Sequence, residues 1–233
     1  MGRQNLLLVP GLLCDRALWQ HQSKHLAELA EITVADVTKH DSMASIAEAL
    51  LIQAPKRFAL AGLSMGGYVV LEIMRRAPER VNKLAMLDTS ARADTKEKTK
   101  GRMELIGLTL KGRFNEVMPR LLPHLVHPNR RQDRQLTNAI VSMAGRVGQD
   151  AFIRQEKAIM ARPDSRHDLH RIICPALVLC GRQDTLSPVE LHEELVACIP
   201  NARLAIIEDC GHMSAMEQPQ AVTALLRDWL LYS

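Results

Sequence analysis

Five residues from Gly62 to Gly66, Gly-Leu-Ser-Met-Gly, place one serine hydroxyl between two glycines. The G-x-S-x-G spacing is typical of a nucleophile elbow, in which a strand turns at once into a helix and exposes the serine oxygen at the bend. Glycine has no Cβ, so it tolerates the backbone angles and close approaches that such a bend requires. Because the same spacing also occurs in ordinary glycine-rich turns, its interpretation depends on the flanking sequence.

The sequence on either side of this turn has the required periodicities. Residues 58–61 are an uninterrupted apolar run, which predicts a buried parallel strand. Beyond the turn, a helix that packs on a sheet is predicted by apolar residues at i, i+3, i+4 and i+7, namely Val70, Ile73, Met74 and Ala77. Pro78 marks the end of this helix. We therefore predict Ser64 as a nucleophile.

A serine hydroxyl is a poor nucleophile at neutral pH unless a base lies within hydrogen-bonding reach. His212 is the candidate base, because it lies in the loop after the apolar run 204–207. In an open parallel sheet, loops at the carboxyl ends of the strands face the ligand crevice. The other histidines lie in predicted helices, in a polar turn or in the region between two strands: His21, His25, His40, His124, His127, His167, His170 and His192.

The base needs an acid that fixes its orientation, and three aspartates compete for this role. Asp184 follows the apolar run 176–180, one strand before His212, which gives the chain order Ser, Asp, His expected for an elbow serine. Asp88 also ends an apolar run and could reach the base. Asp209 is close to His212 in sequence and is expected to organise the loop. We predict Asp184 as the acid, with Asp88 as the alternative.

Acyl transfer also needs N–H donors for the oxyanion that develops on the substrate. The Met65 N–H, directly after the serine, is one candidate, and the other is expected in the loop after an earlier strand. The Leu12 N–H is predicted as that second donor, because Pro10-Gly11-Leu12-Leu13 leaves the first apolar run. The neighbouring residues predicted to contact the substrate are Gly11, Leu13 and Met213.

Alternating strands and helices must position these groups. Apolar runs predict strands at residues 6–9, 32–37, 58–61, 84–87, 176–180 and 204–207. Helical patterns separate them, and one begins at Ser187-Pro188-Val189-Glu190, which has the pattern of a capping box with proline at the first helical position. This alternation predicts an α/β fold with a mostly parallel sheet and helices on both faces.

The region from Asp88 to Ile172 departs from the alternation, because it contains no convincing strand pattern. Helical patterns occupy residues 96–111, 114–126, 132–144 and 150–161. We predict a core made of residues 1–90 and 172–233, with residues 91–171 inserted as a helical cap. A long insertion of this kind is often a lid over a site, and a dimerisation element is the alternative.

Composition excludes several classes of protein. The 233 residues are 47% hydrophobic, but no run approaches the roughly 18 apolar residues of a membrane span. The N-terminal residues lack a signal-peptide pattern, so a cytoplasmic location is expected. An aromatic content of 3% and the lack of a recognition motif argue against nucleic-acid binding. Five cysteines without C-x-x-C spacing argue against disulfide and zinc frameworks, and neither a metal nor a cofactor is expected.

The net charge of +4 is unevenly distributed. Residues 92–134 contain eleven Lys/Arg and five Asp/Glu, a local excess of +6. A solvated helical surface accounts for this pattern, and a basic rim that attracts an anionic substrate is the alternative.

Four motifs in chain order resemble the α/β-hydrolase superfamily: Leu-Val-Pro-Gly-Leu-Leu at 8–13, Gly-Leu-Ser-Met-Gly-Gly at 62–67, Gly-Arg-Gln-Asp at 181–184 and Cys-Gly-His-Met at 210–213. The resemblance implies a mostly parallel sheet, an elbow serine and a cap that begins near Asp88. Within the superfamily the chain looks like the small capped branch of carboxylesterases, enol-lactonases and C–C hydrolases. It departs from the common pattern at Pro10, where a histidine is frequent, and at Lys39-His40-Asp41-Ser42, where a Gly-His-Gly turn is frequent.

The sequence thus predicts a serine hydrolase of a small ester, thioester or lactone that acts through Ser64, His212 and Asp184. A lyase or C–C hydrolase using the same residues on an anionic substrate is one alternative. A non-catalytic ligand-binding protein is the other, and a damaged triad would be its hallmark. The expected partner is a small molecule, and the sequence does not indicate the oligomeric state.

Overall fold

The computed structural model describes residues 3–232, in which six parallel strands form one sheet with the order β2-β1-β3-β4-β5-β6. Residues 1–2 and 233, at the outer limits of the predicted core, lie outside the described part. The strands are β1 (Gln4–Val9), β2 (Ala30–Val34), β3 (Phe58–Leu63), β4 (Val81–Leu87), β5 (Ala176–Gly181) and β6 (Ala202–Ile207). The predicted α/β class and the predicted strands are confirmed. The second strand ends earlier than expected, because residues 35–37 leave the sheet as a loop.

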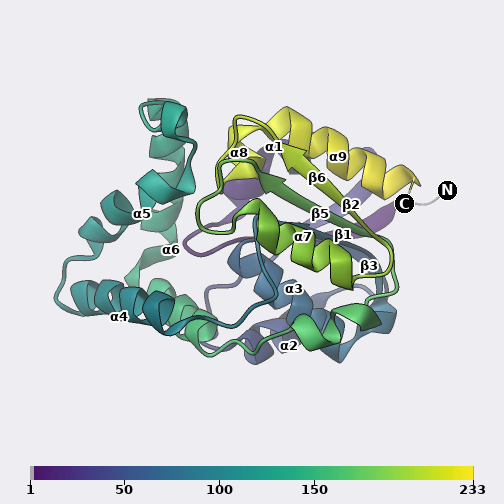
Figure 1. Cartoon of the computed structure of the whole chain (residues 1–233), viewed down its shortest axis with the longest axis horizontal. Coiled ribbons are helices and arrows are strands. Elements are labelled where there is room, and N and C mark those ends of the chain that lie inside the picture. Colours follow the sequence, from purple (N-terminus) through teal and green to yellow (C-terminus); the bar gives the residue numbers. More distant parts are fainter. Residues whose placement is uncertain (1–2, 233) are drawn as a thin grey trace.

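Helices cover both faces of the sheet (Figure 1). Leu6 and Leu8 of β1 point to the face covered by α1 (Gln20–His25) and α9 (Pro219–Tyr232). Leu7 and Val9 point to the opposite face, covered by α2 (Met43–Gln53), α3 (Met65–Arg76) and α7 (Val189–Cys198). A strand buried on both faces needs apolar residues at every position, which explains the uninterrupted runs in the sequence.

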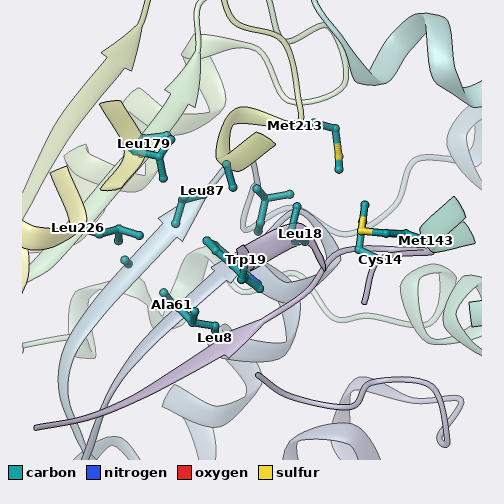
Figure 2. Close-up of a cluster of buried hydrophobic side chains, with 14 of the residues drawn as sticks. Leu8, Cys14, Leu18, Trp19, Ala61, Leu87, Met143, Leu179, Met213 and Leu226 are labelled. Carbon is teal, nitrogen blue, oxygen red and sulfur yellow. The ribbon is translucent and has the colours of Figure 1, made fainter. Parts of the chain in front are cut away.

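Large side chains fill the layer beneath α9. Figure 2 shows that Trp19 and Leu226 from the helical layer lie over this face of the sheet. The sheet residues there come from four adjacent strands: Leu8, Ala61, Leu87 and Leu179.

The strand register brings the functional loops to one edge of the sheet. The β1–β3 ladder ends with Val9 opposite Gly62, and the β5–β6 ladder ends with Gly181 opposite Ile207. The segments that carry Leu12, Ser64, Asp184 and His212 therefore all leave the sheet at its carboxyl edge, as expected for a ligand site in a parallel sheet.

The helical region between β4 and β5 contains α4 (Lys96–Leu110), α5 (Val117–Leu125) and α6 (Arg134–Met160). These helices gather on one side of the core (Figure 1), which confirms an inserted helical region. The last two predicted helices form one element in the structure, interrupted at Gly148, whose φ of 80° and ψ of 168° are not helical. The division into a core and a cap at residues 91–171 stays a prediction.

We expect Leu60→Ala to lower the free energy of unfolding by about 2–5 kcal/mol, because Leu60 lies fully buried in β3 and its removal leaves a cavity. Urea denaturation followed by circular dichroism measures this loss. The control is Ile52→Ala in α2, where the side chain is 79% exposed and a change below about 0.5 kcal/mol is expected. Equal losses in the two variants would contradict the packing described here.

Candidate active site

Ser64 occupies the single position between the end of β3 and the start of α3, with φ 57° and ψ −116°. A positive φ is uncommon and strained for a residue with a Cβ. Backbone hydrogen bonds hold it: the Ser64 N–H donates to Leu87 O at 2.9 Å, and its carbonyl accepts from Gly67 N and Thr89 Oγ1, both at 2.8 Å. The structure therefore fixes this serine in a conformation that the chain would not adopt without these contacts.

Two glycines allow the turn because neighbouring backbone passes very close to them. A Cβ on Gly62 would collide with the carbonyl group of Gly66. A Cβ on Gly66 would collide with the carbonyl oxygen of Val9 at the end of β1. Neither obstacle is a flexible side chain, so glycine is required at both positions.

The structure brings together the three residues that the sequence selected. His212 Nε2 lies 2.8 Å from Ser64 Oγ, and His212 Nδ1 lies 2.7 Å from Asp184 Oδ2. His212 and Asp184 are only 4% and 3% exposed. Since Nδ1–H donates to the carboxylate, the Nε2 lone pair is directed at the serine hydroxyl.

Burial and charge act in opposite directions on this pair. Burial alone would lower the pKa of His212, but the Asp184 carboxylate and its hydrogen bond outweigh burial and raise that pKa above its ordinary value. Burial would likewise raise the pKa of Asp184, but the charge of His212 and the hydrogen bonds from His212 and Ser187 lower it. The pair therefore favours an ionised Asp184 beside a histidine with increased basicity.

Ser187 is a member of the site that the sequence analysis placed elsewhere. Its hydroxyl donates to Asp184 Oδ2 at 2.6 Å and lies 3.3 Å from His212 Nδ1. The expected capping role is wrong, because α7 begins at Val189 with Pro188 at its N-cap and without a side-chain cap. The Leu186 and Ser187 N–H groups bind Asp184 Oδ1 at 2.8 and 3.0 Å, so an aspartate-centred turn explains this stretch.

Glu217 is a second residue near the site that the sequence did not predict. It ends α8 (Ser214–Glu217) and is 2% exposed. Its carboxyl group accepts hydrogen bonds from the backbone N–H groups of Gly211, Met213 and His127 at 3.0, 3.2 and 2.6 Å. Burial nevertheless raises the pKa of Glu217. This carboxyl group links the loop of His212 to the inserted region. The contact with His127 spans 90 residues, so no spacing rule could reveal it.

The two rival aspartates have other partners. Asp88 Oδ1 accepts from the Gly181 N–H at 3.0 Å, and Oδ2 accepts from the Ser214 hydroxyl. Burial, together with the nearby Asp184 carboxylate, raises the pKa of Asp88 well above its ordinary value. Asp209 has a φ of 51° and its carbonyl accepts from Gln218, so it shapes the loop.

The loop after β1 lies directly beside the serine, since a Cβ on Gly11 would be 3.3 Å from Ser64 Cβ. Within residues 3–232, the N–H groups of Leu12 and Met65 donate no hydrogen bond. The Met65 N–H also belongs to the first turn of α3, where the helix dipole favours negative charge. The N–H groups that follow Gly11 and Ser64 are therefore without an acceptor in the described part of the chain.

A cavity of about 400 Å³ opens at Ser64 and His212. The predicted contact residues Gly11, Leu13 and Met213 all line it. Its other walls are mainly apolar and come largely from the inserted region: Leu105, Met118, Leu121, Leu125, Ile140 and Ile159.

Part of the basic stretch reaches this cavity. Lys98, Arg102 and Arg120 line it, as do Glu104 and Glu156. Arg102 is already paired, since its Nη1 donates to Glu156 Oε2 at 2.7 Å and its Nε donates to Asp94 at 3.0 Å. The other two cations have longer contacts, since Arg120 Nη2 lies 3.6 Å from Glu116 Oε2 and Lys98 Nζ donates to Leu186 O at 3.4 Å. Lys98 and Arg120 are therefore less tightly held than Arg102. A larger hollow of about 640 Å³ lies around His21, away from Ser64.

Metal ligands, membrane-spanning helices and cysteines complete the description of residues 3–232. Residues 3–232 contain no group of three His, Cys, Asp or Glu side chains that could hold a metal ion. No helix in that range is long and apolar enough to cross a membrane. The five cysteines are free thiols, and burial raises the pKa of Cys14, which lines the cavity, to about 12.

The amino-acid sequence is similar to those of known proteins over most of its length. Residues 6–225 match the model of the Alpha/beta hydrolase family. The pimeloyl-[acyl-carrier protein] methyl ester esterase of Aliivibrio fischeri is 25% identical over 97% of this chain and 93% of its own length. The corresponding esterase of Nitrosomonas europaea is 24% identical over 93% and 91%.

Solved structures of other proteins have a similar fold over nearly the whole chain. A thermophilic esterase from Thermogutta terrifontis is 28% identical with a TM-score of 0.90, over 99% of this chain and 90% of that one. The enol-lactonase of Burkholderia xenovorans LB400 has a TM-score of 0.88 at 21% identity, over 98% and 92%, and shows the shared fold. The expected superfamily and the prediction of an α/β-fold hydrolase are confirmed.

We expect Asp184→Asn to lower the pKa of His212, because the carboxylate that raises it is removed. The shift of the His212 Cε1 proton, followed by NMR across a pH series, gives this pKa. The control is Asp88→Asn, which should lower the pKa of His212 less, because the raised pKa of Asp88 weakens its charge and it lies outside the hydrogen-bonded chain. An unchanged His212 pKa in Asp184→Asn would contradict the described pairing.

Proposed function

The chain belongs to the Alpha/beta hydrolase family, and from this premise we propose that it hydrolyses small carboxylic esters with Ser64, His212 and Asp184 as its catalytic triad. One observation carries the proposal: an unbroken hydrogen-bonded chain runs from Ser64 Oγ through both nitrogens of His212 to Asp184 Oδ2. The serine has a base and the base has an acid, as the triad mechanism requires. His212 and Asp184 are buried, and Ser64 and His212 line a cavity.

The mechanism follows from the atoms at the site. Ser64 Oγ attacks the ester carbonyl carbon while His212 Nε2 takes the hydroxyl proton. The tetrahedral intermediate collapses, and His212 returns the proton to the departing alcohol. Water, activated by the same nitrogen, then hydrolyses the acyl-enzyme and releases the acid. Asp184 stabilises the histidine cation in both half-reactions.

The Leu12 and Met65 N–H groups are the proposed oxyanion donors. Met65 follows Ser64, Leu12 follows Gly11 beside it, and both N–H groups lack an acceptor among residues 3–232. A preorganised donor of this kind contributes about 3–4 kcal/mol to transition-state stabilisation. The α3 N-terminus adds its dipole at the same place.

The cavity supports a substrate with a short or medium apolar chain. Its volume of about 400 Å³ is at the small end of ligand pockets, and apolar side chains predominate in its walls. The relatives named as methyl ester esterases support an ester with a small alcohol part. In this proposal, residues 91–171 act as the cap that supplies these walls.

Other bonds with the same electrophilic carbonyl stay as alternatives, namely thioesters, lactones and the C–C bonds cleaved by some members of the fold. A purely ligand-binding protein is disfavoured, because the serine, histidine and aspartate lie within hydrogen-bonding distance of one another.

We expect Ser64→Ala and His212→Ala each to lower kcat for a p-nitrophenyl ester by on the order of 10³-fold or more. The double variant should be little worse than either single variant, because the two residues act as a unit. Ser142→Ala, an exposed serine of α6, is the control and should retain full activity. Additive losses in the double variant would argue against a shared role.

We also expect kcat/KM for a carboxylate-bearing ester to fall with ionic strength more steeply than for a neutral ester of equal length. Lys98 and Arg120 line the cavity, and salt shortens the Debye length from about 10 Å at 0.1 M to about 3 Å at 1 M. Arg120→Gln should reduce the difference between the two esters, whereas Lys24→Gln, which lies away from this cavity, should not. Parallel salt profiles would identify the basic stretch as a solvated face.

A further inference from the structure

The loop after β1 holds a strained residue next to the proposed oxyanion donor. Leu13 has a φ of 57°, in the left-handed region that a leucine rarely adopts. A hydrogen bond of 3.2 Å from Cys14 N to Gly11 O closes the turn around Leu12. Something outside the loop must hold it in this form, because the strain itself favours relaxation.

That external contact is the side chain of Gln155, on α6 of the inserted region. The Leu13 N–H donates to Gln155 Oε1 at 3.0 Å, and Gln155 Nε2 donates to Val37 O at 3.3 Å. Gln155 is fully buried, so no water competes for these bonds. Because one partner is a donor and the other an acceptor, only one orientation of the amide satisfies both.

A second contact joins the same helix to Asp15, two residues farther along the chain. Arg146 donates to Asp15 through Nε at 2.6 Å and through Nη2 at 3.2 Å. Arg146 and Gln155 lie on opposite sides of the interruption at Gly148. The two halves of α6 therefore bind Leu13 and Asp15, two residues that follow Leu12 in this loop.

We propose that Gln155 is a positioning residue for the oxyanion loop, which is an inference that rests on the proposed function. Its Oε1 fixes the peptide plane between Leu12 and Leu13. That plane is adjacent to the one that carries the Leu12 N–H, so holding the first restricts rotation of the second. Gln155 thereby keeps the donor aimed at the place where the oxyanion forms.

The helix that carries Gln155 also forms part of the cavity wall. Ile140 and Ile159 of α6 line the cavity, so a bound acyl or alcohol chain packs against the element that carries Gln155. Gln155 thus lies on an element that also borders the cavity.

The test compares Gln155→Met, which removes both hydrogen bonds at similar size, with Gln149→Met, an exposed glutamine on the same helix. Gln155→Met should lower kcat for a neutral p-nitrophenyl ester by about 10- to 100-fold, with KM changed less than about twofold. Gln149→Met should match the parent in both parameters.

Two inhibitors separate oxyanion binding from general damage to the pocket. Butaneboronic acid forms a tetrahedral adduct on Ser64 with an oxygen at the oxyanion position, whereas dipropyl ether only fills the cavity. The boronate should bind Gln155→Met more weakly by the same factor as kcat, and the ether should bind equally well. Equal weakening of both inhibitors, or an unchanged kcat, would overturn the proposal.

Gln155→Glu keeps the proposal testable if the methionine variant does not fold. A protonated carboxyl group can accept from Leu13 N–H and donate to Val37 O as the amide does, whereas a carboxylate would face the Val37 carbonyl. The boronate affinity of Gln155→Glu, taken relative to the parent at each pH, should be near parental at low pH and fall as pH rises. A ratio well below parental at low pH, where the carboxyl group is protonated, would overturn the proposal. Failure of the proposed function is recognised separately, because the parent protein would then hydrolyse no ester.

Discussion

The conformation of Ser64 is the constraint on which the site depends. A positive φ at a non-glycine residue places its side chain at the tip of the turn between β3 and α3. This conformation is possible only because Gly62 and Gly66 let backbone pass within contact distance on either side. It is maintained by hydrogen bonds to Leu87 and Thr89 at the end of β4. The central strands of the sheet thus hold the strain, and a buried parallel sheet is rigid enough to do so.

The inserted region contacts both loops that flank Ser64. The Met213 N–H donates to Leu125 O at 3.0 Å, and Glu217 links the same loop to His127, so the position of His212 depends on the end of α5. The β1 loop depends on α6 in the same way, through Gln155. The apolar walls of the cavity come from the same helices. Removal of the inserted region would therefore disturb His212 and the loop after β1 together, which are the proposed base and the proposed source of an oxyanion donor.

The sequence predicted the groups that local rules govern. Apolar runs marked the strands, and residues directly after strand ends, such as Ser64, Asp184 and His212, meet at one edge of a parallel sheet. It did not predict Ser187, Glu217 or Gln155, because each acts through hydrogen bonds that depend on how distant segments pack. The proline-capped pattern at 187–190 was misassigned for a local reason: the Ser187 hydroxyl donates to the carboxylate of Asp184, three residues earlier, and does not cap the helix.

Covalent labelling tests the central claim most directly. The protein is treated with a fluorophosphonate, digested, and analysed by peptide mass spectrometry. A nucleophilic serine activated by His212 predicts one adduct, on Ser64, and its loss in His212→Ala. Ser187 and Ser214 are the informative internal comparisons, since both hydroxyls are buried near the site but donate to carboxylates. Absence of an adduct on Ser64, or labelling of Ser187 or Ser214 instead, would contradict the assignment of the nucleophile.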